Sequence, residues 1–349
     1  MKIIHCADVH LGSRMNKFPK DKAEERAREV RASFERMITY AKREGIDTIL
    51  LAGDIFDSDR PFKKDKEFFY SAVKRNSEIT FFYLRGNHDG NESYTEEIEN
   101  LKTFGGNWTS YTLGWNVVLS GIEMDRNNCL SMYSTLNLDP DNLNIVMLHG
   151  QAGDSSGDGK INLLRLKNKG IDYLALGHVH TQGKKPLDER GISVYSGCLE
   201  GRGFDETGEK GFMVYDTDTK EVNFVPFAYR TIEEIDIDIS GTQDGYGAEQ
   251  KIKSEIKIDE KNLLRLNLTG EIDFVDENLA LDVEKYISDM CYFVSVKDNT
   301  RLKIDYSAFK DSLSLKGEFV RLVSGAELDD EDRQKILDIG MKALSGERD

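Results

Sequence analysis

The stretch that decides the fold is residues 48–54, with the sequence TILLAGD. A short apolar run ends in a glycine and an aspartate, and such runs are typical of strands buried on both faces. Four further runs have the same character and are also closed by a glycine or a polar block: 2–4, 79–84, 144–148 and 172–176. These five strands predict a layered α/β (α+β) fold.

Helical patterns separate the first three strands. Residues 21–43 are rich in Glu, Arg and Ala with apolar residues at helical spacing, and residues 63–74 repeat that spacing. The chain is therefore predicted to open as β-α-β-α-β. A strand-like pattern follows in 192–195, 211–215 and 222–226, and we expect these segments to form a second sheet.

A change in composition near residue 230 divides the chain. Beyond it, Ile235, Ile237 and Ile239 alternate with aspartates, as in a strand with one wet face. We predict three parts: a first α/β domain in 1–230, a small α+β domain in 231–300, and a C-terminal helical segment in 301–349. Of the net charge of −16, residues 1–230 carry −4 and residues 231–349 carry −12.

Composition excludes several classes of protein. The 349 residues are 39% hydrophobic, which is enough for a core, and no apolar run resembles a signal peptide or a membrane span. We expect a soluble, cytoplasmic protein that does not bind membranes, with its four separated cysteines reduced. The acidity argues against coating nucleic acid by bulk electrostatics, but two divalent cations would bring residues 1–230 close to neutrality and admit an anionic substrate.

Polar blocks follow the five strands, where the carboxyl ends of an open α/β sheet converge. The blocks combine oxygen ligands with imidazoles and contain no thiolate: Asp8-Val9-His10, Gly53-Asp54, Gly86-Asn87-His88-Asp89, His149-Gly150 and Gly177-His178-Val179-His180. This donor set suits manganese or iron, with zinc as an alternative. Each block alone is a weak signal. Five of the six histidines lie in them, however, which indicates one metal site; we interpret His5, inside the first strand, as a core residue.

In this order the blocks resemble the motifs of the calcineurin-like metallophosphoesterase superfamily. Within it, residues 176–180, 195–212 and 314–319 resemble bacterial DNA repair exonucleases of the SbcD type, and the YhaO-like branch in particular. The resemblance implies a four-layer α/β/β/α sandwich of two mixed sheets, followed by the small α+β cap domain and the helical tail.

The resemblance also implies a site with two divalent metal ions, for which we expect manganese. One ion would be bound by Asp8, His10, Asp54 and His180, and the other by Asp54, Asn87, His149 and His178, with Asp54 as the bridge. His88 would act on the scissile phosphate, and Asp89 would hold the tautomer of His88. Asp57 stands where several archaeal and eukaryotic relatives carry a second histidine.

The implied function is a metal-dependent DNA nuclease. A hydroxide generated between the two ions would hydrolyse phosphodiester bonds, in double-strand-break repair or end processing. The sequence leaves exonuclease and endonuclease activity both open. A phosphatase or a cyclic-nucleotide phosphodiesterase on the same scaffold is the alternative, although neither would need residues 231–349.

The expected partners are DNA and an SMC-like (SbcC-type) ATPase, and a homodimer is compatible with the sequence. Basic residues flank the metal blocks and are either DNA contacts or ordinary surface: Arg14, Lys17, Lys20, Arg60, Lys63 and Lys64. The C-terminal apolar positions, within predicted helices up to residue 348, either dock the ATPase or pack on the chain's own cap.

Overall fold

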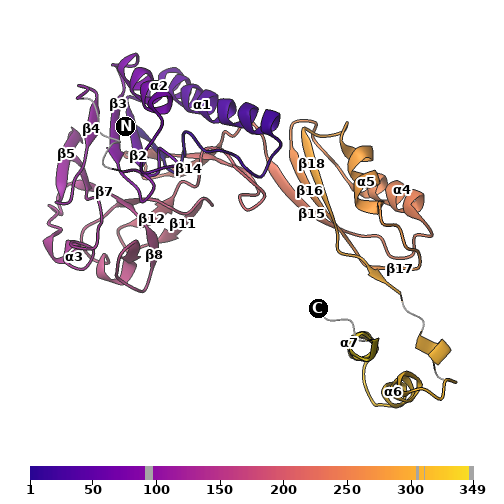
Figure 1. The fold of residues 1–349 in the computed structure, drawn as a ribbon. Coiled ribbons are helices and arrows are strands. Elements are labelled where there is room, and N and C mark those ends of the chain that lie inside the picture. The colour runs from indigo at the N-terminus through magenta and orange to yellow at the C-terminus, as the bar shows by residue number, and fades with distance from the viewer. Residues whose placement is uncertain (91–96, 304–305, 310, 346–349) are drawn as a thin grey trace. The chain divides into compact units, whose positions relative to one another are not determined.

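The structure, a computed structural model, describes residues 1–90, 97–303, 306–309 and 311–345. The chain divides into two compact units (Figure 1). The first contains Met1–Glu234, Ile258–Arg265 and Ser288–Val294, and the second contains Ile235–Lys257, Leu266–Ile287 and Ser295–Asp349. The finer division into parts 1–230, 231–300 and 301–349 stays a prediction.

The first unit contains two six-stranded mixed sheets. The first sheet has the order β14-β13-β1-β2-β3-β4. Its strands are β1 (Lys2–Cys6), β2 (Thr48–Ala52), β3 (Thr80–Leu84), β4 (Leu101–Thr103), β13 (Gly211–Asp216) and β14 (Val222–Pro226). β1 to β4 are parallel, while β13 runs antiparallel to both of its neighbours, β1 and β14.

The second sheet has the order β11-β12-β10-β7-β6-β5. Its strands are β5 (Thr109–Gly114), β6 (Val117–Gly121), β7 (Leu143–His149), β10 (Tyr173–Gly177), β11 (Gly183–Pro186) and β12 (Ile192–Tyr195). The four strands β6, β7, β10 and β12 are parallel, and the outer strands β5 and β11 pair antiparallel. The strands β8 (Gln151–Gly153) and β9 (Lys160–Asn162) form a separate pair.

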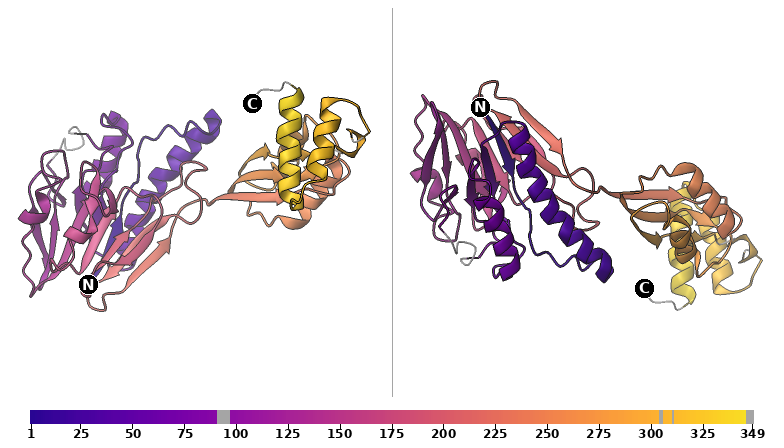
Figure 2. Two further views of the ribbon diagram at one scale, coloured as in Figure 1. Left: turned by 90° about the horizontal axis from the view of Figure 1, so that it is seen from below. Right: turned by 90° about the horizontal axis from the view of Figure 1, so that it is seen from above.

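Three hydrophobic clusters separate the layers. Helices α1 (Lys20–Arg43) and α2 (Lys63–Lys74) cover the outer face of the first sheet (Figures 1 and 2), because their apolar positions, such as Phe34 and Phe69, pack on strand residues such as Ile49. A second cluster fills the space between the sheets. A third covers the outer face of the second sheet with the short helix α3 (Met132–Thr135). The expected α/β sandwich of two mixed sheets is confirmed.

The predicted second sheet was wrong in its membership. Only β12 of the segments in 192–227 joins it, whereas β13 and β14 return to the first sheet beside β1. The second sheet is instead built from the apolar runs of β7 and β10 together with β5, β6 and β11. Strand periodicity shows that a segment is extended, but hydrogen bonding between distant segments decides its neighbours.

Between Tyr229 and Leu302 the chain contains three smaller groups of elements. One is a three-stranded sheet of β15 (Ile232–Asp238), β16 (Leu263–Thr269) and β18 (Phe293–Asp298). The short strands β17 (Glu271–Ile272) and β19 (Arg301–Leu302) pair with each other, and helices α4 (Gly245–Glu255) and α5 (Leu279–Ile287) are in contact. The alternating isoleucines at 235, 237 and 239 predicted β15, whereas α4 was not predicted.

The C-terminal helices are α6 (Leu315–Ser324) and α7 (Asp330–Ser345), and they pack on each other. Their shared core contains Val320, Val323, Leu337 and Met341. The last residues of the helix predicted to end at residue 348 lie outside the described residues.

No helix in the described parts of the chain has the length and apolar character needed to cross a membrane. The cytoplasmic location stays a prediction. All four cysteines are buried, and their reduced state stays a prediction.

Candidate metal centre

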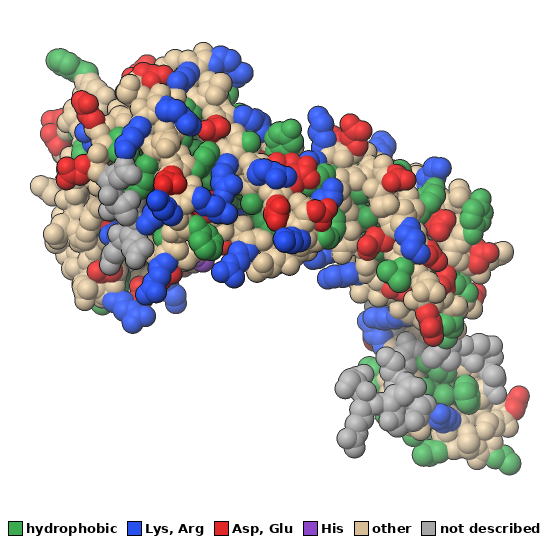
Figure 3. Space-filling model, turned by 45° about the horizontal axis from the view of Figure 1, so that its top comes forward, with side chains coloured by type: hydrophobic (Ala, Val, Ile, Leu, Met, Phe, Trp, Pro, Cys, Tyr) green, Lys and Arg blue, Asp and Glu red, His purple; other side chains and the backbone are tan. Residues whose placement is uncertain are grey.

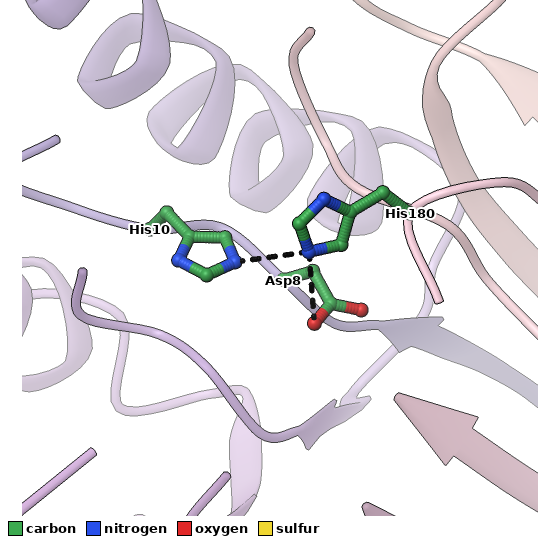
Figure 4. A group of neighbouring side chains, drawn as sticks. All are labelled: Asp8, His10 and His180. Atoms are coloured by element: carbon green, nitrogen blue, oxygen red, sulfur yellow. Dashed lines mark hydrogen bonds and ion pairs between the residues drawn. The ribbon is translucent and has the colours of Figure 1, made fainter. Parts of the chain in front are cut away.

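Asp8, His10 and His180 form the first of two clusters of potential metal ligands. Asp8 and His10 follow β1 of the first sheet, whereas His180 follows β10 of the second. The Nε2 atoms of His10 and His180 are 3.2 Å apart, and Nε2 of His180 is 3.8 Å from Oδ1 of Asp8. Figure 4 shows the three side chains facing one another. Both sheets therefore contribute to one site.

Asp54, His149 and His178 form the second cluster, and Asn87 joins it. Oδ1 of Asn87 lies 2.9 Å from Nδ1 of His178 and 3.1 Å from Nε2 of His149. Nε2 of His149 lies 3.3 Å from Oδ2 of Asp54. The clusters adjoin, because the amide of His10 donates to the Asp54 carbonyl over 3.0 Å. All seven residues proposed from the sequence as metal ligands thus lie in two adjoining groups.

The backbone of four of these residues is left-handed, a conformation that residues other than glycine rarely adopt. The φ angle is 53° at Asp8, 52° at His10, 53° at Asp54 and 100° at His178. Such a conformation costs about 1–3 kcal/mol per residue and persists only where the surroundings enforce it. Here the amide of Asp8 donates to the Gly53 carbonyl, and the carboxylate of Asp8 accepts from the amide of His178.

Three glycines allow the strand ends to approach closely. A Cβ atom on Gly53 would lie 2.2 Å from Nδ1 of His149, and one on Gly86 would lie 2.2 Å from Oδ1 of Asp54. A Cβ on Gly177 would lie 1.9 Å from the carbonyl oxygen of Ala52. These contacts are far shorter than van der Waals distances, so the glycines that precede the ligands are required for the two clusters to form.

Burial and mutual repulsion shape the charges of the site. Burial raises the pKa of Asp8 to about 7, and the negative charge of Asp54 acts in the same direction. Burial lowers the pKa of His10 to about 4, so its imidazole is neutral near pH 7. Burial also opposes the charged forms of Asp54 and His149, but their hydrogen bond and attraction lower the pKa of Asp54 and raise that of His149 to about 9.

The donor set fits divalent cations. Two carboxylates, one amide oxygen and four imidazoles converge in two groups, and a neutral imidazole such as His10 offers a lone pair to a metal. Two cations would also offset the charges of Asp8 and Asp54, which are both buried. Asp8, His10 and His180 would hold one cation, and Asp54, Asn87, His149 and His178 the other.

His88 and Asp89 do not form the pair expected from the sequence. His88 is exposed, and its ring meets the edge of the His10 ring with 5.2 Å between centroids. The Asp89 carboxylate turns inward and accepts hydrogen bonds from the amides of Ile55, Phe56 and Gly86. The proposed role of Asp89 in holding the His88 tautomer is therefore corrected: Asp89 ties the loop of Gly86 to the turn that follows Asp54, because buried amides at both turns need an acceptor.

Sequence reasoning missed three residues that contact the ligands, namely Asp57, Arg202 and Glu206. Oδ1 of Asp57 lies 3.0 Å from Nδ1 of His10, and Oε1 of Glu206 lies 2.7 Å from Nδ1 of His180. The sequence contained a signal for Asp57, because its position three residues after Asp54, in the turn after β2, places it near the ligands. Glu206 and Arg202 had none, since nothing in their spacing separates them from other charged residues in loops.

Residues 1–182 match the family of calcineurin-like phosphoesterases. The chain belongs to this family. Members are phosphoesterases by name, and the sequence resemblance to the family is confirmed. Because the matched residues include both clusters, the candidate metal centre lies within the calcineurin-like phosphoesterase part of the chain.

Relatives extend the similarity beyond the phosphoesterase part. The DNA double-strand break repair protein Mre11 of Sulfolobus acidocaldarius is 25% identical, over 97% of this chain and 94% of the relative. The Mre11 protein of Sulfurisphaera tokodaii is 28% identical over 68% of this chain and 63% of its own length. An uncharacterized metallophosphoesterase of Bacillus subtilis, YhaO, is 27% identical over 64% and 59%. The phosphoesterase is thus distantly homologous to Mre11 and YhaO over most of its length.

One solved structure is also similar, a dimetal phosphatase from Danio rerio. It has a TM-score of 0.41 and 9% identity, and the match covers 61% of this chain and 91% of the phosphatase.

Replacing Asp54 by Ala is predicted to weaken metal binding at both clusters. Oδ2 of Asp54 lies 3.3 Å from Nε2 of His149 in the second cluster, and the charge of Asp54 also acts on Asp8 and His10 in the first. Loss of a residue that only hydrogen-bonds a metal ligand already costs about 10–100-fold in metal affinity. Loss of the ligand Asp54 itself is therefore expected to cost about a hundredfold or more. Elemental analysis after dialysis measures it, with His10→Ala as a control that empties mainly one site. Two retained metals in Asp54→Ala would contradict the bridging role.

Manganese affinity is predicted to rise with pH between about 6 and 9. Without metal, Asp8 has a pKa of about 7 and His149 a pKa of about 9, and both must lose a proton to donate to a cation. Below each pKa the affinity should fall by about tenfold per pH unit for each proton released. Calorimetric titration in two buffers of different ionisation enthalpy counts the protons, and an affinity independent of pH would contradict the prediction.

Proposed function

We propose that the protein is a manganese-dependent DNA nuclease that hydrolyses phosphodiester bonds in double-strand-break repair or end processing. The observation that supports this most is the similarity to a DNA double-strand break repair protein over 97% of this chain, together with two adjoining clusters of metal ligands in one phosphoesterase domain. A phosphoesterase that acted on small substrates alone would not need residues 231–349.

The proposed roles of the residues follow from their positions. Asp54 would help to hold a cation at each of the two sites, and bound cations would supply Lewis acidity and lower the pKa of water. His88 is exposed beside His10, which leaves it free to reach a phosphate at the metal centre. There it would stabilise negative charge or protonate the leaving oxygen.

An anionic substrate has room beside the first cluster. A hollow of about 610 Å³ is lined by Asp57, Arg202 and Glu206, which contact the ligand histidines, and by Arg14 and Arg60. Figure 3 shows Lys and Arg side chains over one face of the first unit, interspersed with Asp and Glu. Arg14 and Arg60 are exposed, so they can bind phosphates of a strand that leads away from the metals.

A substrate panel tests the proposed function. We predict that manganese supports cleavage of linear duplex, hairpin or single-stranded DNA, that EDTA abolishes it, and that Arg14→Ala with Arg60→Ala weakens DNA cleavage more than cleavage of a nitrophenyl phosphodiester. The position of the cut on end-labelled DNA separates exonuclease from endonuclease activity. Turnover of a phosphopeptide or a cyclic nucleotide without turnover of DNA would support the alternative phosphatase or phosphodiesterase instead.

His88→Asn is predicted to retain both metals and to lower the rate of DNA cleavage about 10²–10⁴-fold, since it removes one general acid or charge stabiliser. The rate at saturating manganese and the metal content by elemental analysis are the measurements. Asp89→Asn serves as the comparison, because its carboxylate bonds backbone amides. It is expected to lower the stability of the loop. Near-normal turnover of His88→Asn would contradict its proposed role.

The C-terminal helices are proposed to dock an SMC-like (SbcC-type) ATPase. The apolar side chains of these helices divide between two faces, one packed between the helices and one exposed. Val320 and Leu337 are buried between the helices, whereas Leu322 is 66% and Ile339 71% exposed. Apolar side chains on a helix surface are a common means of binding a partner groove.

Leu322→Asp with Ile339→Asp is predicted to weaken binding of such an ATPase by about 2 kcal/mol or more, roughly 30-fold in Kd, without changing cleavage of small phosphodiesters. Both side chains are exposed, so the fold should tolerate the change. Leu164→Asp, at a position 58% exposed in the first unit, is the matched control. Unchanged binding of the double variant would contradict docking through these helices.

A further inference from the structure

The two histidines of the first cluster each have a carboxylate behind them. Nδ1 of His10 lies 3.0 Å from Oδ1 of Asp57, and Nδ1 of His180 lies 2.7 Å from Oε1 of Glu206. In both rings the opposite nitrogen, Nε2, is the one that faces the cluster. A proton on Nδ1 would therefore be held by the carboxylate, which leaves the Nε2 lone pair free for a cation.

Arg202 joins the two carboxylates. Its guanidinium donates to Oδ1 of Asp57 over 2.6 Å and to Oε1 of Glu206 over 2.7 Å. The amide of Arg202 also donates to Oε2 of Glu206 over 2.7 Å. The side chain of Glu206 is only 4% exposed, whereas those of Arg202 and Asp57 are 18% and 27% exposed, so the Glu206 carboxylate is the most shielded of the three from water. We name Asp57, Arg202 and Glu206 the clasp.

The second cluster is supported differently. Nδ1 of His149 lies 2.8 Å from the carbonyl oxygen of Ala52, which is a neutral acceptor. His178 turns Nδ1 itself toward Asn87. In the described chain, no carboxylate is found behind either ring at the position that Asp57 and Glu206 occupy behind His10 and His180. The clasp carries a net charge of −1, whereas the support of the second cluster is uncharged.

We propose that Asp57, Arg202 and Glu206 are positioning residues that make the site of Asp8, His10 and His180 the tighter of the two metal sites, so that it fills first. The carboxylates fix the orientation and tautomer of both imidazoles and add negative charge behind them, which increases the electron density that each ring donates. Arg202 fixes the two carboxylates relative to each other, so the two histidines are positioned as one unit.

The proposal rests on the metal centre of the proposed function, but not on DNA as the substrate. Metal binding can be measured with manganese alone. A failure to cleave DNA would therefore not contradict the proposed role of the clasp. A wild-type protein that binds no manganese would contradict both the metal centre and the role of the clasp.

The test isolates each site in turn. The substitution His178→Ala in the full chain leaves the site of Asp8, His10 and His180. Adding Glu206→Gln to this variant is expected to weaken manganese binding at that site about 10–100-fold. Calorimetric or electron paramagnetic resonance titrations measure the affinity. In the full chain with His10→Ala, the other site remains, and Glu206→Gln is expected to leave its affinity unchanged. Gln keeps the size of the side chain and a hydrogen-bond acceptor, so a purely structural role would be preserved.

Asp205→Asn is the matched control. Asp205 is adjacent to Glu206 and loses the same charge, but its carboxylate pairs with Lys17 instead of a ligand histidine. It should not change the manganese affinity of either single-site protein.

A double-mutant cycle tests the coupling through Arg202. Asp57→Asn and Glu206→Gln, alone and together in the His178→Ala protein, are expected to give a combined loss that differs from the product of the single losses. The proposal is overturned if Glu206→Gln leaves the affinity of the first site unchanged, if it weakens both sites equally, or if Asp205→Asn has the same effect.

Discussion

The repulsion between two buried carboxylates, Asp8 and Asp54, is the constraint on which the rest of the site depends. They follow the neighbouring parallel strands β1 and β2, and each is only 1% exposed. Burial opposes the charged forms of both: it raises the pKa of Asp8, with the charge of Asp54 acting in the same direction, whereas the hydrogen bond to His149 keeps the pKa of Asp54 low. Four imidazoles and one amide surround them, and the arrangement becomes electrostatically favourable when cations occupy the space between these donors.

Such a cluster needs a rigid backbone around it. The ligands sit at the ends of fully buried strands such as β2 and β10, where hydrogen-bonded neighbours on both sides hold the strained turns. The glycines at 53, 86 and 177 then let strands from two sheets come within contact distance. The cost of left-handed ligands is offset by the hydrophobic layers on which both sheets rest.

The residues around the cluster divide into separate roles. Asp89 accepts hydrogen bonds from backbone amides, whereas Asp57 and Glu206 contact ligand histidines. His88 takes part in none of these contacts and lies exposed beside the centre. In the second unit, α6 and α7 bury one apolar face against each other and expose another. The proposed chemistry and the proposed partner binding therefore lie in different parts of the chain, so experiments on each part can separate them.

The sequence by itself determined the buried strands β1, β2, β3, β7 and β10, the two long helices and the positions of the seven proposed ligands after strand ends, because apolar runs closed by Asp, Asn and His are local signals. It also determined the family, since the order of those blocks is specific. Only the tertiary structure decided that β13 and β14 complete the first sheet, that Asp89 turns away from His88, and that Glu206 and Arg202 lie behind the ligand histidines. Those outcomes depend on hydrogen bonds between residues as far apart as His10, Asp57 and Arg202. The periodicity of the sequence does not indicate such a contact, because the contact forms only when the chain has folded.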